Sequence, residues 1–256
     1  MTVSRNFERW SPLMLLTVLL LLWQLVVVGF SIPEFIFPSP WQIALKFVEF
    51  GGALFDAAWK TFWVTMLGFG LSIVVGVMLG FLVGSSRLAY AALYPLLVGF
   101  NAVPKAAVVP ILVVWFGIGL GPGILTAFLI SFFPITVNIA TGLATLEPEL
   151  EDVLRVLGAK RWDVLIKVGL PRSMPYFFGS LKIAITLAFV GTVLAEMTAG
   201  DSGIGYLMQT AGSQQRMALA FAGLVTIGVM AMAMYELFSF IEKRTTGWAH
   251  RGSQAA

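Results

Sequence analysis

One short stretch of the sequence has the residue pattern of a serine nucleophile. Gly-Asp-Ser-Gly at 200–203 sets Ser202 in the Gly-x-Ser-Gly pattern of nucleophilic serines. A serine becomes a nucleophile only when a base lies beside it. The single histidine, His250, lies in the polar C-terminal tail, and the apolar stretch 217–241 would hold it across a membrane from Ser202. We therefore interpret 200–203 as a glycine-rich turn and not as a catalytic site.

Other common reactive sites are also excluded by composition. The chain has no cysteine, which excludes disulfides and thiolate metal sites, and one histidine cannot make a histidine cluster. The phosphate-binding pattern G-x-x-x-x-G-K-[ST] does not occur. We expect a protein that is not an enzyme and that carries no metal or cofactor, so any ATP hydrolysis belongs to another chain.

A few polar residues inside apolar stretches are the remaining candidates for chemistry. Intramembrane ionisable residues are functional candidates by default. Glu196 lies close to one end of an apolar stretch, where we expect water to reach it, and has either a structural hydrogen-bonding role or a role in a pathway or gate. Asn101, Asn138 and Ser202 are further pathway candidates, whereas Glu236 is expected to be structural.

The elements that position these residues follow from composition. The 256 residues are 59% hydrophobic and 11% charged, with a mean hydropathy of +0.91. Soluble domains carry about 25% charged residues. The deficit leaves too few charges to cover a water-facing surface, so the chain is an integral membrane protein.

Hydropathy predicts an all-α fold with about six transmembrane helices in a single domain, 1–256, whose core is about 55–245. A helix needs about 20 mostly apolar residues to cross a bilayer. The N-terminal run is too long for a signal peptide and is interpreted as an uncleaved first span. In the third span, Pro104, Lys105 and Pro110 predict an interfacial or broken first half. The expected spans are 12–30, 61–85, 99–118, 122–143, 176–199 and 217–241.

Basic residues are concentrated on one predicted side of the membrane. The positive-inside rule then places both termini in the cytoplasm, and we expect a bacterial inner-membrane location. The other side holds only Lys46, Lys60 and Arg216. The cytoplasmic side holds Arg5, Arg9, Arg87, Arg155, Lys160, Arg161, Lys167, Arg172, Lys243, Arg244 and Arg251.

Two further segments have recognisable patterns. Small residues recur at every fourth position of the second span, which forms a ridge for close packing, either within the chain or against a second subunit. The segment 41–60 mixes charged and apolar residues and is predicted to be one amphipathic helix on the outer face. The ridge consists of Gly68, Ser72, Gly76, Gly80 and Gly84.

The cytoplasmic segment 144–175 is predicted to form two short amphipathic helices. Gly158 lies where a left-handed residue would end the first helix, and Pro171 is expected to end the second. Their apolar faces are covered either by the protein's own span ends and the lipid interface or by the groove of a partner. The membrane tethers at both ends argue against DNA binding, and no nucleic-acid partner is expected.

The spacing in this segment resembles the EAA loop of binding-protein-dependent ABC importer permeases. That pattern is Glu-Ala-Ala, three residues, Gly, nine residues, Ile, one residue and Leu-Pro. Segments 32–40, 109–124 and 195–208 resemble the nitrate/sulfonate/taurine branch of the same family. Gly158, Leu170 and Pro171 match this pattern, and Asp152 and Val168 are conservative replacements for its Glu and Ile. Val153 and Leu154 stand in place of the two alanines, and Ala159, Arg161 and Trp162 lie among these positions.

The resemblance implies a type I importer with the MetI-like permease fold. Its implied partners are a cytoplasmic ATPase dimer, an extracytoplasmic substrate-binding protein, a second permease subunit and membrane lipid. The loop would be the coupling helix that docks on the ATPase. The implied substrate is a small nutrient: a sulfonate-, taurine- or nitrate-like anion or a heterocyclic precursor. A channel or secondary carrier outside this family and a scaffold protein are the alternatives.

Overall fold

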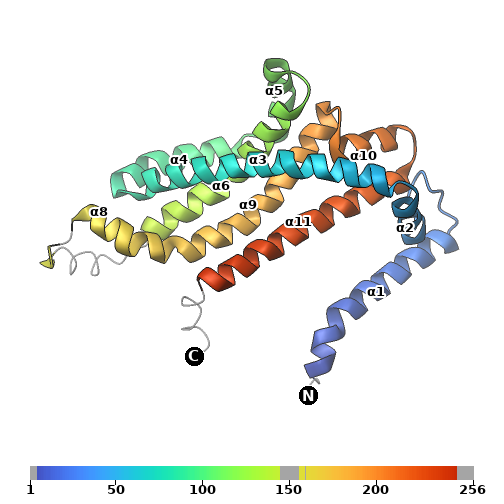
Figure 1. Cartoon of the computed structure of the whole chain (residues 1–256), viewed down its shortest axis with the longest axis horizontal. Helices are drawn as coiled ribbons and strands as arrows, with labels where there is room; N and C mark the ends of the chain where they lie inside the picture. The colour runs from blue at the N-terminus through green and yellow to red at the C-terminus, as the bar shows by residue number, and fades with distance from the viewer. Residues whose placement is uncertain (1–4, 145–155, 159, 247–256) are drawn as a thin grey trace.

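The structure is a computed structural model and describes residues 5–144, 156–158 and 160–246. Long helices lie side by side and make up the described part of the chain (Figure 1). They are α1 (Arg5–Gly29), α2 (Pro40–Glu49), α3 (Gly51–Gly84), α4 (Arg87–Ala102), η1 (Lys105–Val108), α5 (Val109–Phe116), α6 (Leu120–Ala144), α8 (Arg161–Val164), η2 (Leu165–Gly169), α9 (Leu170–Ala199), α10 (Gly203–Ser213) and α11 (Met217–Thr245).

The predicted all-α membrane architecture is confirmed. Five helices of the described residues are long and apolar enough to cross a membrane, and a bent pair can supply a sixth span. The pair is α4 with η1–α5, at 73° to each other, so the predicted break is confirmed but 99–118 is not one straight span. Pro104 cannot donate a backbone hydrogen bond, and Val103 before it is extended at ψ 127°, which ends α4.

The small-residue ridge of α3 packs against α6 of the same chain. A Cβ added at Gly80 would lie 2.8 Å from the Ile139 Cβ. Ser72 Oγ lies 2.7 Å from Ser131 Oγ. Later residues of α3 contact later residues of α6, so the two helices run parallel. Of the two interpretations of the ridge, packing within the chain is therefore correct.

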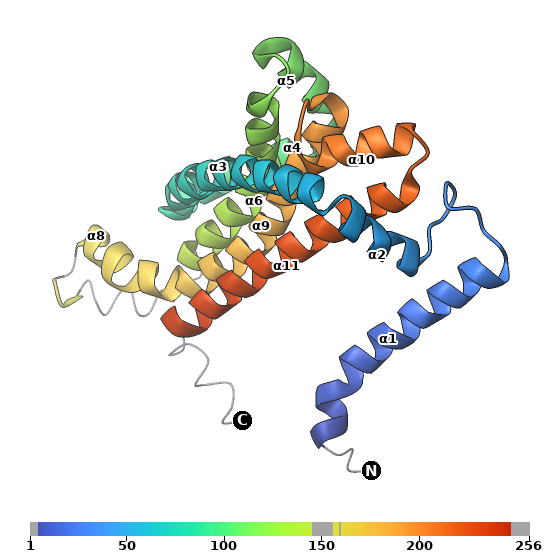
Figure 2. The same cartoon turned by 45° about the vertical axis from the view of Figure 1, so that its right-hand side comes forward.

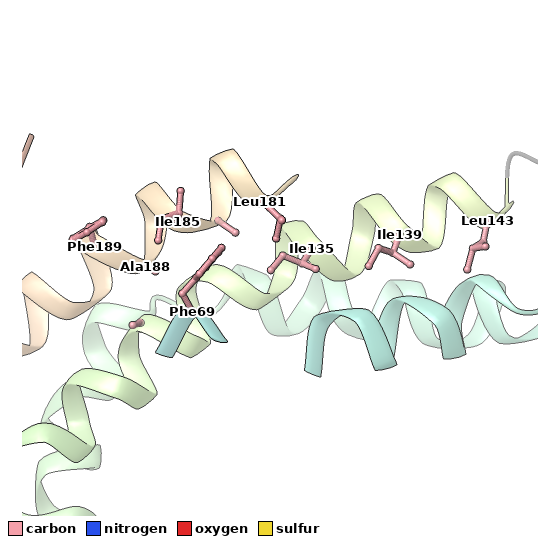
Figure 3. Close-up of a cluster of buried hydrophobic side chains, with 10 residues drawn as sticks. Phe69, Ile135, Ile139, Leu143, Leu181, Ile185, Ala188 and Phe189 are labelled. Atoms are coloured by element: carbon pink, nitrogen blue, oxygen red, sulfur yellow. The ribbon is translucent and has the colours of Figure 1, made fainter. Parts of the chain in front are cut away.

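The apolar core lies where α3, α6 and α9 meet. Figure 3 shows Ile135 and Ile139 of α6 beside Leu181 and Ile185 of α9, with Phe69 of α3 below them. Gly191 of α9 lets its backbone approach α6, since an added Cβ there would lie 2.9 Å from a backbone oxygen of α6. These three helices form the frame that positions the other elements.

Helix α1 lies apart from this frame (Figures 1 and 2). Only 6% of its apolar window is buried within the chain. At its C-terminal end Trp23 stacks on Phe37, with ring centroids 5.2 Å apart, and Phe37 contacts Phe221 of α11. The aromatic contacts anchor one end of α1 and leave most of its surface to lipid or to another chain.

The prediction of one amphipathic helix over 41–60 is wrong. Helix α2 ends at Glu49, and α3 begins at Gly51 and continues through the predicted second span. The capping box of Ser39 and Gln42 fixes the start of α2. Residues Leu54 and Ala57 of α3 are buried in the same face as Thr61, so the apolar stripe of the span begins earlier than hydropathy indicates.

The segment after the predicted turn is a helix, α10, which the sequence did not predict. Helix α10 has glycines at 203, 205 and 212, which lower its intrinsic helix propensity. It is stabilised by packing on α9, α11 and α3. The turn itself is confined to Gly200–Ser202, before Gly203 at φ 93°.

Pro171 does not end the second cytoplasmic helix. Helix α8 continues through the π-helical turn η2 into α9, where Pro171 lies in the first turn. Pro171 follows closely on the wider π turn, where the register of the backbone hydrogen bonds shifts. Residues 161–169 of the predicted loop are thus a direct extension of the core helix α9.

Candidate functional site

The carboxylate of Glu196 joins three helices near one end of the bundle. Its oxygens accept hydrogen bonds from the Thr61 hydroxyl on α3, at 2.9 Å, and from the Gly205 N–H on α10, at 2.9 Å. Thr61 Oγ1 also accepts the Ile204 N–H at 2.8 Å. We call Glu196, Thr61 and the N–H groups of Ile204 and Gly205 the polar clasp.

The clasp supplies the N-terminal cap of α10 from two other helices. Ser202 is the N-cap residue but makes no side-chain cap bond, and its hydroxyl donates instead to Asp201 at 2.9 Å. The first N–H groups of a helix need acceptors, because they have no partner within the helix. The oxygens of Glu196 and Thr61 provide these acceptors, which fixes α10 on α3 and α9.

Glu196 is buried, with 8% of its surface exposed. Helix α10 folds over it and limits the access of water that its position near the helix end predicts. A pocket beside it holds about 20 Å³, enough for a single water. Lys60, Asp201 and Ser202 line that pocket with Glu196.

Thr61 was missed by sequence reasoning, which has no local signal for a contact spanning 135 residues. A second buried threonine pair extends the polar contacts inward. Thr65 Oγ1 lies 2.9 Å from Thr192 Oγ1, between α3 and α9. Both side chains are fully buried. Polar side chains hence continue from the clasp into the interior of the bundle.

Asn101 and Asn138 have different surroundings. The Asn101 amide oxygen accepts a hydrogen bond from Lys105 Nζ at 2.9 Å, at the break after α4, and Asn101 is exposed. The Asn138 amide donates to the Pro134 carbonyl at 2.8 Å within α6. Asn138 has a local structural partner, whereas Asn101 lies on an open surface.

The predicted cytoplasmic loop is described only in part. Asp152, Val153, Leu154 and Ala159 lie outside the described residues. Gly158 has φ 86°, so its predicted left-handed conformation is confirmed. Beside it, Val156 and Leu157 are 87% and 77% exposed.

The remaining loop residues lie on the extension of α9. Arg161 and Trp162 are in α8, Val168 is in η2, and Leu170 and Pro171 begin α9.

Asp163 stabilises the start of this extension. Lys167 Nζ lies 3.0 Å from its carboxylate, and the Lys160 N–H donates to it at 3.2 Å. The hydrogen bond from Lys167 and then that from Lys160 hold the pKa of Asp163 below its ordinary value. Asp163 thus caps α8 and remains ionised at neutral pH.

An ion pair fixes α9 to α11 within the bundle. Lys182 Nζ lies 2.5 Å from the Glu242 carboxylate, and both side chains are at most 20% exposed. The sequence reasoning considered Glu236 near the basic end of α11, but the acid that pairs is Glu242. The pair holds α11 close to the helix that α8 and η2 extend.

The loop and the polar clasp lie at opposite ends of α9. Helix α9 has 30 residues, a length of about 45 Å. Figure 2 shows α8 at one end of the molecule and α10 at the other. The continuous helical stretch from Arg161 to Ala199 therefore begins close in sequence to the exposed apolar turn at Gly158 and contains the buried carboxylate of Glu196 near its other end.

Comparisons with known proteins agree with this geometry. Residues 72–247 match the family described as "binding-protein-dependent transport system inner membrane component". A riboflavin transport system permease protein, RibX, from Chloroflexus aurantiacus is 32% identical over 95% of this chain and 92% of its own length. A putative aliphatic sulfonates transport permease protein, SsuC, from Bacillus subtilis is 29% identical over 95% of this chain and 89% of its own length.

A solved structure shares the fold. The inward-facing MetNI methionine ABC transporter has a chain with a TM-score of 0.67 and 19% sequence identity, covering 77% of this chain and 98% of its own. This similarity confirms the expected MetI-like permease fold. With the match to the family over most of its length, the chain belongs to the family of binding-protein-dependent transport system inner membrane components, the permeases of ABC importers.

Proposed function

We propose that this permease forms a translocation path for a small nutrient and is driven by a separate cytoplasmic ATPase through the segment 144–175. The observation that carries the proposal is the exposed apolar turn at Val156 and Leu157, which precedes in sequence the helical extension of α9 that begins at Arg161. Large apolar side chains on a charged cytoplasmic loop are exposed to water at a cost in free energy unless a partner buries them. A groove on an ATPase provides such cover.

The electrostatics of this turn support a soluble protein partner. Lys160 is exposed, and Arg161 and Lys167 follow it in the chain. Positive charge around an apolar contact steers the approach of an acidic surface and fixes its orientation. In the same assembly we infer a cytoplasmic location of both termini, a bacterial inner membrane and an extracytoplasmic substrate-binding protein.

The substrate is proposed from the relatives and the site. The two relatives above are named for riboflavin and for aliphatic sulfonates. A heterocyclic nutrient and a small anion are thus both represented among similar chains. We infer a small nutrient of one of these two classes, delivered by the binding protein.

The coupling role is tested by two substitutions at one position. Gly158 has φ 86°, and no other atom lies within 4 Å of an added Cβ, so a side chain there acts through the backbone alone. A β-branched residue in this conformation costs about 1–2 kcal/mol or more, whereas asparagine tolerates it. We expect Gly158→Val to reduce co-purification of the ATPase and to uncouple ATP hydrolysis from uptake. Gly158→Asn should retain most of both.

A third variant tests the apolar contact itself. Leu157→Asp should lose the ATPase as Gly158→Val does, because it places a charge in the docked face. Ile36→Asp, a similar change at an exposed residue between α1 and α2, is the control. Membrane levels are measured by blotting and ATPase retention by pull-down. Full ATPase retention and uptake in Leu157→Asp and Gly158→Val would rule out the coupling role.

A further inference from the structure

The break between α4 and η1 lies at the middle depth of the bundle. The ring of Phe100, near the end of α4, contacts Phe132 with centroids 5.8 Å apart. Phe132 lies halfway along the membrane helix α6. Lys105 Nζ is 5.9 Å from the centroid of the Phe100 ring. The ammonium group of Lys105 is therefore far from both ends of the membrane-crossing helices.

The surface around this ammonium is open on the single chain. Phe100 and Val103 are 47% and 48% exposed, and Asn101 and Ala106 are exposed as well. Lys105 donates to the backbone and side-chain oxygens of Asn101. An ammonium group has three donors. Within the described part of the chain no carboxylate pairs with Lys105, so its charge is uncompensated and one donor is left over.

Lipid cannot cover such a surface. Irregular backbone and a charged side chain at membrane depth are tolerated only where protein buries them or where they line a water-filled cavity. Broken helices at this depth frequently form the binding sites of transporters. The combination of a helix break, an exposed amide and an uncompensated cation favours contact with water and with a solute of opposite charge.

We propose that Lys105 and Asn101 line the translocation path and form a subsite for a small oxyanion, such as a sulfonate or carboxylate group of the nutrient. The inference rests on the proposed transport function and selects the anionic class of its substrates. Lys105 supplies the charge and the free donor. Asn101 orients the ammonium group, because its two oxygens hold Nζ beside the break.

The subsite can be tested without knowing the substrate, since the chain has no native cysteine. Ala106→Cys places one thiol on the exposed surface beside Lys105. In membrane vesicles it is treated with two methanethiosulfonate reagents of similar size, one carrying a sulfonate and one a trimethylammonium group. We expect both to react, with a ratio of anionic to cationic rates about tenfold higher with Lys105 than with Lys105→Gln. Lys105→Arg should keep the high ratio.

Met78→Cys is the matched control, because Met78 is 67% exposed on the side of α3 that the rest of the described chain leaves uncovered. It should react with a membrane-permeant maleimide but not with the charged reagents. If Ala106→Cys is also inert to the charged reagents, its surface faces lipid or a protein contact, and the proposal fails. An unchanged rate ratio in Lys105→Gln would also overturn it.

Failure of the proposed function would have a different signature. The same vesicles are solubilised, and ATPase co-purification is measured. If the ATPase does not co-purify but the ratio of reagent rates still depends on the charge of Lys105, the coupling role is contradicted and the anion subsite stands. Retained ATPase with a charge-independent ratio would contradict the subsite alone.

Discussion

At the scale of single residues, the polar clasp concentrates several interactions on Glu196 and Thr61. Two N–H groups of α10 find their acceptors there and nowhere else in the local chain. A buried N–H left without an acceptor costs about 1–3 kcal/mol. Changes at these two side chains should therefore act on α10 first and on the remaining bundle little.

We expect Glu196→Ala to loosen α10 and to lower uptake, because Gly205 loses its acceptor. Glu196→Gln keeps an oxygen in place and should retain most of the uptake. Hydrogen exchange at Ile204 and Gly205, together with uptake by membranes that contain equal amounts of each variant, measures both effects. Thr61→Ser against Thr61→Val is the matched pair on α3, since only serine keeps the hydroxyl. Unchanged uptake in both Glu196 variants would exclude Glu196 from the transport path.

The sequence could identify some site residues but not their partners. Gly158 was predictable because a left-handed residue between two helices is almost always glycine, and its φ is 86°. Glu196 stood out as an acid in an apolar stretch. Thr61 did not, because threonines are common in such stretches and its role depends on a contact with a distant helix. The same holds for the pairing of Lys182 with Glu242, which lies 60 residues away.

At the scale of elements, the parallel pair α3–α6 is the most tightly constrained contact. An added Cβ at Gly80 would lie 2.8 Å from both the Ile139 Cβ and the Thr136 backbone oxygen, so the helices must move apart to admit it. Overpacking of this kind costs about 1–3 kcal/mol. We expect Gly80→Ala to lower the Tm of the detergent-solubilised protein.

Gly70 is the control for that change, because it lies in the same helix with no atom within 4 Å of an added Cβ. Replacing a mid-helix glycine by alanine there should be neutral or stabilising by about 0.5–1 kcal/mol. The difference between the variants isolates the contact with α6 from helix propensity. Equal Tm values for Gly80→Ala and Gly70→Ala would show that the two helices do not pack as described.

Hydropathy predicted the elements that are long and uniformly apolar, and it failed where packing against other helices decides whether a segment is helical and where the helix begins. The start of α3 was placed too late because Asp56 and Lys60 interrupt the apolar stretch around the buried residues Leu54 and Ala57. Helix α10 was not predicted because its glycines lower its helix propensity, whereas its stability comes from the clasp and from neighbouring helices. The continuation through Pro171 depends on the π turn before it, which has no distinctive residue pattern.

At the scale of the whole molecule, a single chain leaves surfaces that lipid does not suit. The break at Pro104 exposes polar groups at the middle depth of the bundle, and the ridge on α3 is already used by α6. A path beside Lys105 would be open on one side if the chain were alone. We therefore expect a second permease to close it, although the ridge that first suggested a subunit interface does not provide one.

We expect the second permease to be another copy of this chain, in a complex with two ATPase subunits. Identical copies related by a two-fold axis bring the same surface together twice, so one exposed break on each chain would face a common path. Co-expression of two differently tagged copies tests this directly. Purification on the first tag and then on the second should retain both copies and the ATPase, and the mass in detergent should correspond to two permeases and two ATPases. As a control, mixing separately purified membranes should give no doubly tagged complex. If the second purification step retains nothing while each single step yields an ATPase-bound complex active in transport, the permease works alone or with a different partner, and the symmetric path is excluded.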